Sequence, residues 1–320
     1  ALASNSHTLI LVRALQGLSA GAGLVVSRAM VQDLFKGAEA QRVMATVTMV
    51  FGLAPALAPI VGGWLLNLIN WRAIFVFMAI FSALLWLVCQ RGLPESLPPS
   101  QRSAFHFREI MARYRESLSH RGFLLMIIAI ALMFAGTPLY IGSAPAFVMN
   151  ILGLPVTAFG WLFIPMIAGT MGGSWMARRL ARKVAPEKLL HIGLWIMLLA
   201  ALANVGYCSL GPVQLPWAVL PLLVYNFGMG LIMPSAILRA LSIFPHMRGL
   251  SASLQSFVQM MSFSLITGFV APILYHSALM IAIGMLVLFV AGVLLWQVAM
   301  RFSADGSAPQ QAASNPAVPR

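Results

Sequence analysis

Acidic residues are scarce in this chain. Seven Asp and Glu stand against 20 Lys and Arg in 320 residues, and none of the seven lies inside the apolar stretches that follow one another from Thr8 to Met300. With 8% charged and 60% hydrophobic residues, the composition excludes an ordinary soluble domain, in which about a quarter of the residues are charged. The acids fall between the stretches or at their edges, at Asp33, Glu39, Glu95, Glu109, Glu116, Glu187 and Asp305.

Cysteine is rarer still, and the motifs of several protein classes are missing. Cys89 and Cys208 belong to no CxxC or Cys/His pattern, so we interpret them as small apolar packing residues. The histidines have no metal-ligand spacing, so we expect no metal and no cofactor. Neither an H-E-x-x-H string, nor a G-x-x-x-x-G-K-[ST] string, nor an acid pair within an apolar stretch is present. We therefore expect neither an intramembrane enzyme nor an ATP-driven pump.

The chain contains several long apolar runs. About 20 helical residues cross the roughly 30 Å hydrocarbon core of a bilayer, so each run predicts a membrane-spanning helix. The predicted fold class is an all-α polytopic membrane protein. We predict nine spans, whose boundaries are good to about four residues, at 8–32, 42–66, 72–93, 123–148, 158–178, 188–209, 216–240, 250–273 and 277–300.

Basic residues lie almost entirely on one side of these spans. One set of connections includes Arg91, Arg115 and Arg178, whereas the opposite set holds Arg72, with Arg13 just inside the first span. Because basic loops are retained in the cytoplasm, we predict a cytoplasmic C-terminus. The net charge of +13 is then a signal of membrane topology, and we expect no nucleic-acid partner.

Four segments are expected from this pattern. They are three helices in 1–93, a cytoplasmic connection in 94–122, six helices in 123–302 and a disordered, Ala/Ser/Pro/Gln-rich cytoplasmic tail in 303–320. Within the connection, Phe107, Ile110 or Met111, Tyr114 and Leu118 recur at helical spacing. This pattern predicts a short amphipathic helix, which lies either on the inner leaflet or in solvent as a linker.

A weak internal repeat links the first predicted span to the seventh. The strings Gly21-Ala-Gly-Leu-Val-Val and Gly228-Met-Gly-Leu-Ile-Met each lie in mid-span. Glycine-rich apolar strings also recur by chance. If the repeat is a duplication, its offset of six helices indicates two parallel six-helix halves, of which the first lacks three helices here.

The most specific string is Gly52-Leu-Ala-Pro-Ala-Leu-Ala-Pro-Ile-Val-Gly-Gly63 in the second predicted span. Pro55 and Pro59 remove backbone donors from one helix face, and Gly62 and Gly63 leave room for a neighbouring backbone. Such a helix is kinked and closely packed. The string is either ordinary membrane-helix composition or the seal between two moving helices.

This string resembles the antiporter motif of the major facilitator superfamily. Leu11-Val-Arg-Ala-Leu-Gln-Gly-Leu-Ser-Ala-Gly resembles that superfamily's fourth-helix motif, with Arg13, Gln16 and Gly17 in the expected places. Trp71-Arg72-Ala-Ile-Phe and Phe244-Pro-His-Met-Arg-Gly249 are similar to the Bcr/CflA branch of drug efflux proteins. The resemblance covers residues 1–302 and implies a major facilitator fold without its first three helices, 3 + 6 spans in place of 6 + 6.

The chain departs from the family pattern in two ways. The acidic residue expected in the first helix would precede Ala1, and so would the family's loop between its second and third helices. In the second half, the counterpart of that loop, Gly172-Gly-Ser-Trp-Met-Ala-Arg-Arg-Leu-Ala-Arg182, keeps its glycines and arginines but lacks the acid. We therefore expect the coupling carboxylate to lie outside this chain, which alone would not couple transport to protons.

Candidate functional residues are polar or aromatic groups within spans. Arg13 is either part of the proton pathway, with Gln16 sharing its hydrogen bonds, or an anchor that reaches the outer headgroups. Substrate contacts are expected near broken helices, in an apolar pocket with few polar groups, although each candidate also fits simple packing. These candidates are Tyr140, Trp161, Tyr225, Asn226, Gln255 and Gln259.

The resemblance implies a secondary active transporter in the bacterial inner membrane. Its expected function is export of small amphipathic compounds or drugs in exchange for protons by alternating access. The alternative is a proton-coupled importer of a small metabolite. Its expected partners are the substrate, protons and the lipid bilayer, and we expect a monomer.

Overall fold

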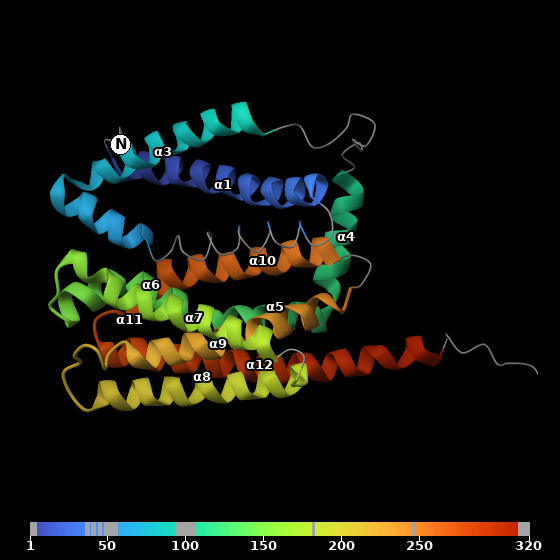
Figure 1. Ribbon diagram of the computed structural model, residues 1–320. Coiled ribbons are helices and arrows are strands. Elements are labelled where there is room, and N and C mark those ends of the chain that lie inside the picture. Colours follow the sequence, from blue (N-terminus) through green and yellow to red (C-terminus); the bar gives the residue numbers. More distant parts are fainter. Residues whose placement is uncertain are drawn as a thin grey trace, which may run out of the picture. The chain divides into compact units, whose positions relative to one another are not determined.

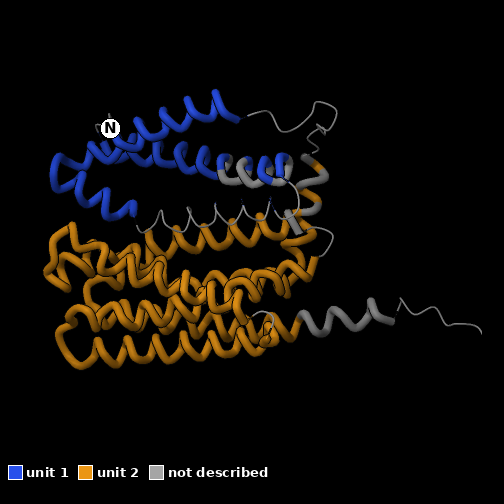
Figure 2. The backbone as a smooth tube through the Cα atoms, in the orientation of Figure 1, with its two compact units in different colours: residues 1–105 blue, residues 106–320 orange. Residues whose placement is uncertain are grey.

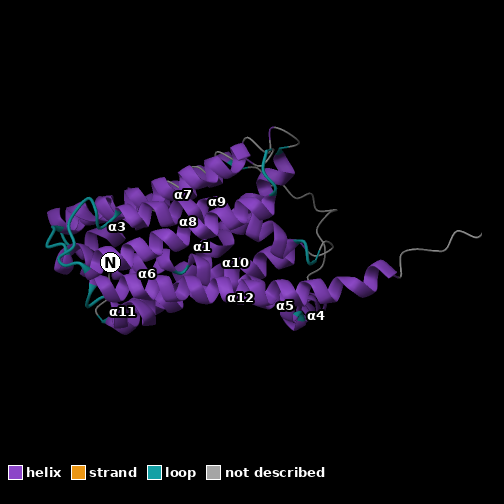
Figure 3. Ribbon diagram, turned by 90° about the horizontal axis from the view of Figure 1, so that it is seen from below, coloured by secondary structure: helices purple, strands orange, loops and turns teal. Residues whose placement is uncertain are grey.

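The computed structural model describes residues 5–35, 57–93, 107–180, 183–244 and 248–312, with Glu39, Val43 and Val47 besides. Within these ranges every regular element is helical and no strand occurs (Figure 3). Figure 2 shows that the chain divides into two compact units, Ala1–Phe105 and His106–Arg320. The predicted all-α class is therefore confirmed for the described residues.

The first unit contains α1 (Ser6–Leu34), the short apolar helix Leu57–Leu68 and α3 (Trp71–Gly92). Polar side chains fix where its long helices begin. The Oδ1 atom of Asn5 accepts a hydrogen bond of 2.8 Å from the backbone N–H of Thr8. Asn70 caps α3 in the same way, at 3.2 Å from the N–H of Ala73. Each Asn satisfies a donor that the first helical turn leaves free.

The second unit is a bundle whose long helices run alongside one another (Figure 1). Its elements in chain order are α4 (Phe107–Ser119), α5 (Arg121–Phe134), α6 (Gly136–Pro145), the π-helix η2 (Ala146–Ile151), the 3-10 helix η3 (Val156–Phe159), α7 (Gly160–Leu180), α8 (Pro186–Ser209), α9 (Leu220–Leu241), α10 (Arg248–Leu265), the π-helix η4 (Ile266–Val270), α11 (Ala271–Leu274) and α12 (Ala278–Ala312).

Six helical stretches of the described residues are long and apolar enough to cross a membrane. A seventh span results if Arg121–Phe134 and Gly136–Ile151, which are bent by 41° at their break, count as one. These stretches match the third to ninth predicted spans. The first predicted span is the 29-residue helix α1, which is not among the six, and the second is described only over Leu57–Leu68. The count of nine thus stays a prediction.

Helix α4 bears out the amphipathic pattern of the long connection. It runs across the spans rather than along them (Figure 1), and it packs against α5 and α10. The hydroxyl oxygens of Tyr114 and Ser253 lie 3.4 Å apart, and the side chain of Ser117 is buried. Its exposed side chains include Met111 and Leu118. Whether this face meets lipid or water stays a prediction.

The last helix reaches into the segment that the sequence predicts as the tail. Helix α12 continues through Ser303 to Ala312, and residues 313–320 lie outside the described part. The composition of 303–312 is polar, but extending an existing helix adds one hydrogen bond for each residue fixed and needs no new nucleus. The disorder expected for residues 303–320 stays a prediction.

Glycines set the closest helix contacts of the second unit. A Cβ atom built on Gly169 or Gly173 of α7 would collide with the backbone carbonyls of Leu223 or Phe227 of α9. On α9, a Cβ atom at Gly230 would collide with the carbonyl of Thr170. Small residues let membrane helices approach to backbone contact. Helices α7 and α9 are therefore in contact along their backbones.

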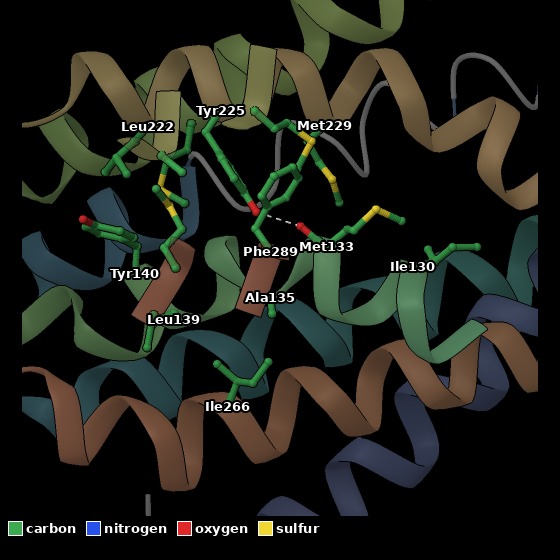
Figure 4. Close-up of a cluster of buried hydrophobic side chains, with 14 of the residues drawn as sticks. Ile130, Met133, Ala135, Leu139, Tyr140, Leu222, Tyr225, Met229, Ile266 and Phe289 are labelled. Carbon is green, nitrogen blue, oxygen red and sulfur yellow. Dashed lines mark hydrogen bonds between the residues drawn. The ribbon is translucent and has the colours of Figure 1, made fainter. Parts of the chain in front are cut away.

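The core of this unit is apolar and aromatic, as Figure 4 shows. The side chain of Tyr225 is fully buried, and its ring packs edge to face against Phe289 with centroids 5.9 Å apart. Its hydroxyl donates a hydrogen bond of 2.8 Å to the carbonyl of Met133. The hydroxyl of Tyr225 is thus held by a partner from a neighbouring helix.

Candidate functional site

Arg13 and Gln16 are neighbours on α1, as their spacing predicts. The Nη1 atom of Arg13 donates a hydrogen bond of 3.0 Å to Oε1 of Gln16. The guanidinium carbon of Arg13 also lies 4.7 Å from the ring centroid of Phe75 on α3. A cation over an aromatic face is attracted to it. Two helices of the first unit therefore hold the orientation of this charge, and the role of Arg13 remains a prediction.

The antiporter string is only partly described. Gly52 and Pro55 lie outside the described residues. Pro59 and Gly62 are half-buried and Gly63 is buried. A Cβ atom built on Gly62 meets nothing within 4 Å, so no described backbone occupies the space that this glycine leaves. The expected close approach of a neighbouring helix at Gly62 therefore stays a prediction.

Asn226 is a polar centre in the middle of α9, and its side chain is only 2% exposed. Its Oδ1 atom accepts a hydrogen bond of 2.8 Å from the hydroxyl of Thr137 on α6. Its Nδ2 atom donates to the carbonyl of Leu222 at 2.8 Å. The hydroxyl of Thr170 on α7 lies 3.5 Å from the same Oδ1 atom. One amide thus gathers polar groups from three helices.

Tyr140 has a different partner. Its hydroxyl accepts a hydrogen bond of 2.7 Å from Nδ2 of Asn204 on α8, and the Oδ1 atom of that Asn lies 3.8 Å from the sulfur of Cys208. In Figure 4 the hydroxyl of Tyr140 points away from that of Tyr225. The two tyrosines therefore share one core, but their hydroxyl groups bond to different helices.

The remaining candidates are separate from these groups. Gln255 and Gln259 lie one turn apart on α10, and Nε2 of Gln255 donates to Oε1 of Gln259 at 2.9 Å. Gln255 is buried, whereas Gln259 is half-buried. Trp161 stands at the start of α7 with 55% of its surface exposed, so it does not point into the core of this unit. The structure pairs the glutamines with each other and places Trp161 at the surface.

Three polar residues of this core were missed by sequence reasoning. Thr137, Thr170 and Asn204 bond to candidates that were identified, yet none was itself proposed. Asn204 is fully buried in the apolar helix α8, so its position in mid-span was the available signal. Asn204 was not among the predicted residues because these were chosen beside proline breaks, and α8 has proline only at its start.

A recess at one end of the second unit contains none of the candidates. Its volume is about 320 Å³, and it is lined by the ends of η2 and α8, the α8–α9 connection and the start of α12. Cys208 and His276 are among its lining residues. Among the described residues, no group of three or more His, Cys, Asp or Glu side chains is arranged to hold a metal ion. The polar centres therefore lie inside the helix bundle and not in this recess.

Comparison with known proteins gives one family. The family model described as Major Facilitator Superfamily matches residues 1–272. Because this is well over half of the chain, the match shows the family directly.

Relatives with curated names agree with this family. The chain is 28% identical over 204 residues to a bicyclomycin resistance protein homolog of Haemophilus influenzae, which covers 61% of this chain and 51% of the relative. It is 26% identical over 256 residues to multidrug resistance protein D of Escherichia coli, covering 78% and 62%. It is 26% identical over 225 residues to chloramphenicol resistance protein CraA of Acinetobacter baumannii, covering 70% and 54%.

The chain spans about half to two thirds of the length of these curated relatives. The matches extend over both compact units of the chain. Apolar helices of membrane-spanning length, the fourth-helix and antiporter strings, and the family match all agree. The chain belongs to the Major Facilitator Superfamily, a family of membrane transporters.

Proposed function

We propose that this chain serves in a secondary active transporter that exports small amphipathic compounds or drugs in exchange for protons. The printed names of several relatives are those of multidrug or antibiotic resistance proteins. The observation that carries the proposal is the buried Asn226, whose amide bonds to Thr137 inside an apolar bundle. A drug pocket needs a few fixed polar groups within apolar walls.

The proposed substrate surface lies on α6 and α9 of the second unit. Tyr140 and Tyr225 supply broad aromatic surface there, and Asn226 supplies a polar group whose position is fixed. Gln255 and Gln259 on α10 are further candidates, because their amides bond to each other and can exchange that bond for one to a substrate. Trp161 stays a candidate only for contacts outside the core of this unit.

The proposed proton pathway includes Arg13 and Gln16. A guanidinium stays protonated, so Arg13 does not carry the proton itself but orients neighbouring polar groups. Its bond to Gln16 and its place over Phe75 suit that role. The acid that accepts the proton is not proposed from this chain, since none of its acids lies inside an apolar stretch.

We place the transporter in the bacterial inner membrane with a cytoplasmic C-terminus, acting as a monomer by alternating access. The excess of Lys and Arg in one set of connections favours this orientation. The Pro59, Gly62 and Gly63 string favours an exchanger over the alternative, a proton-coupled importer. In either case two helical bundles move against each other around a substrate site near the membrane midplane.

The test is transport in everted membrane vesicles from cells that express the whole transporter in which this chain is proposed to serve. Acidifying the vesicle interior should drive uptake of a fluorescent amphipathic cation, and a protonophore should abolish it. Asn226→Ala should reduce uptake at equal membrane abundance, while the exposed Asn150→Ala should not. Uptake that does not depend on the proton gradient would refute proton exchange. Proton-driven movement in the opposite direction would favour the importer.

A further inference from the structure

Four basic side chains gather where α7 ends and α8 begins. Arg178 and Arg179 lie in the last turn of α7, Lys183 lies in the connection, and Lys188 lies in the first turn of α8. All four are exposed. We call these four residues the basic rim. Their place at the end of two spans puts them at the boundary between the membrane and water on the predicted cytoplasmic side.

No described carboxylate pairs with the basic rim. Glu187 is the acid in this part of the sequence, and its Oε1 atom pairs with Nη1 of Arg239 at 3.3 Å. Within the described residues, none of the four rim side chains has an ion pair. Among the side chains that the structure describes, no carboxylate therefore balances these four positive charges.

The rim is held on a rigid base. Ala177, Leu189 and Leu231 are buried together beneath it, and Leu180 and Val184 pack against them. The backbone N–H groups of residues 183 and 184 donate to the carbonyl of Leu180 at 2.8 and 2.9 Å. Residues 183 and 184 are thus bonded back to the end of α7. The four charges are presented from a fixed support and not from a loose loop.

An aromatic side chain marks the depth of the rim in the bilayer. Trp175 is 43% exposed, and the guanidinium carbon of Arg179 lies 4.1 Å from its ring. Trp is enriched where hydrocarbon meets the headgroups, and the ring also fixes the direction of the guanidinium. Arg179, which lies over this ring, is therefore expected near the level of the headgroups.

We propose that the basic rim binds the headgroup phosphate of an anionic phospholipid. Clusters of four or more Lys and Arg at the cytoplasmic end of a membrane helix attract anionic lipids. Two adjacent arginines supply the paired donors that suit phosphate oxygens. Lys183 and Lys188 add charge from the other helix, so the phosphate sits between the ends of α7 and α8. This site is independent of the substrate and proton pathways proposed above.

The experiment measures lipid binding to the whole chain in a neutral detergent by native mass spectrometry. Phosphatidylglycerol and phosphatidylcholine are titrated separately, because only the first has a net negative headgroup. The parent should retain phosphatidylglycerol in clear preference. The triple variant Arg178→Gln, Arg179→Gln and Lys183→Gln should bind it on the order of a hundredfold more weakly, because each basic group near the surface contributes about fivefold in affinity.

Two variants serve as controls. Arg108→Gln, Arg115→Gln and Arg301→Gln together remove the same charge from exposed positions outside the rim and should leave the affinity within about twofold of the parent. Glu187→Gln releases Arg239 from its ion pair and should strengthen binding. Circular dichroism and gel filtration check that each variant keeps its helices and its size.

Three results would overturn the proposal. One is equal retention of the two lipids, and another is unchanged phosphatidylglycerol binding in the rim variant. The third is a rim variant that loses thermal stability in lipid-free detergent yet binds lipid like the parent. That outcome would mean that the rim pairs with protein carboxylates rather than with a lipid.

Discussion

The hydroxyl of Thr137 donates a 2.8 Å hydrogen bond to Oδ1 of Asn226 across the interface between α6 and α9. Helix α6 begins just after the bend at residue 135, where the span of α5 and α6 turns by 41°. The bond therefore ties the bent half of a span to α9, whose backbone is in contact with α7. The two sides of this interface thus share one short polar contact.

We predict that Thr137→Val lowers the stability of the protein by about 0.6–1.7 kcal/mol, the range of hydrogen bonds between membrane helices. Val keeps the shape of Thr but cannot donate, so Oδ1 of Asn226 loses its shortest partner. Unfolding by increasing amounts of a denaturing detergent, followed by loss of helical circular dichroism, measures the change.

Thr170→Val is the matched control for that variant. The single hydroxyl proton of Thr170 is directed to the carbonyl of Met166 at 3.0 Å, and its distance to Asn226 is 3.5 Å. We expect this second substitution to have the smaller effect. Equal losses in the two variants would mean that the bond between Thr137 and Asn226 is not the stronger one.

Two adjacent glycines on α7 allow a test of helix packing. Gly173→Ala should destabilise the protein by about 1–3 kcal/mol, the usual range for overpacking, because its new Cβ atom would collide with the carbonyl of Phe227. Gly172→Ala should be tolerated, since its Cβ atom would meet only the ring of the same Phe at 3.4 Å. Both substitutions change helix propensity equally. The difference in melting temperature between the two variants therefore reports the close contact, and equal melting temperatures would argue against it.

The sequence predicted the apolar spans of the second unit well because each is a long run without acids. It predicted the contact of Arg13 with Gln16 because residues three apart share a helix face. It did not predict which glycines meet a neighbouring backbone. Gly172 and Gly173 are the same residue type in the sequence, and only the direction from which α9 approaches distinguishes them. That direction depends on the packing of several helices at once.

The candidate substrate residues were likewise predicted only in part. Asn226 and Tyr140 were identified because they lie near proline breaks, and both prove to be buried and hydrogen-bonded. Trp161 met the same criterion but stands at the exposed start of α7. Asn204 lies in a helix without an internal proline, so the criterion excluded it. A polar residue in mid-span was the better signal, because burying an amide in an apolar bundle requires a partner.

A substitution in the antiporter string is predicted to impair transport without lowering stability. Gly62→Leu should leave membrane abundance and melting temperature near those of the parent, because no described atom lies within 4 Å of the added Cβ position. Efflux should nevertheless be lost or become leaky, if a neighbouring helix needs that space during the transport cycle. Resistance of cells to a substrate drug, at equal expression, measures the effect. Parental resistance would remove Gly62 from the proposed seal.

The last prediction concerns the charge of Arg13. Arg13→Lys should abolish proton-coupled efflux, because an ammonium group cannot copy the planar arrangement that bonds Gln16 and covers Phe75. Arg72→Lys is the matched control, since the guanidinium of Arg72 also lies over an aromatic ring, at 4.3 Å from the centroid of Trp71.

An arginine that only anchors a helix tolerates replacement by Lys better than one that orients polar groups, since Lys reaches the headgroups almost as well as Arg. Arg72 lies in the first turn of α3, where an anchor is expected, so its substitution should preserve efflux. Proton-driven uptake in everted vesicles, corrected for membrane abundance, compares the two variants. If Arg13→Lys transports like Arg72→Lys, both arginines are anchors, and Arg13 has no place in the proton pathway.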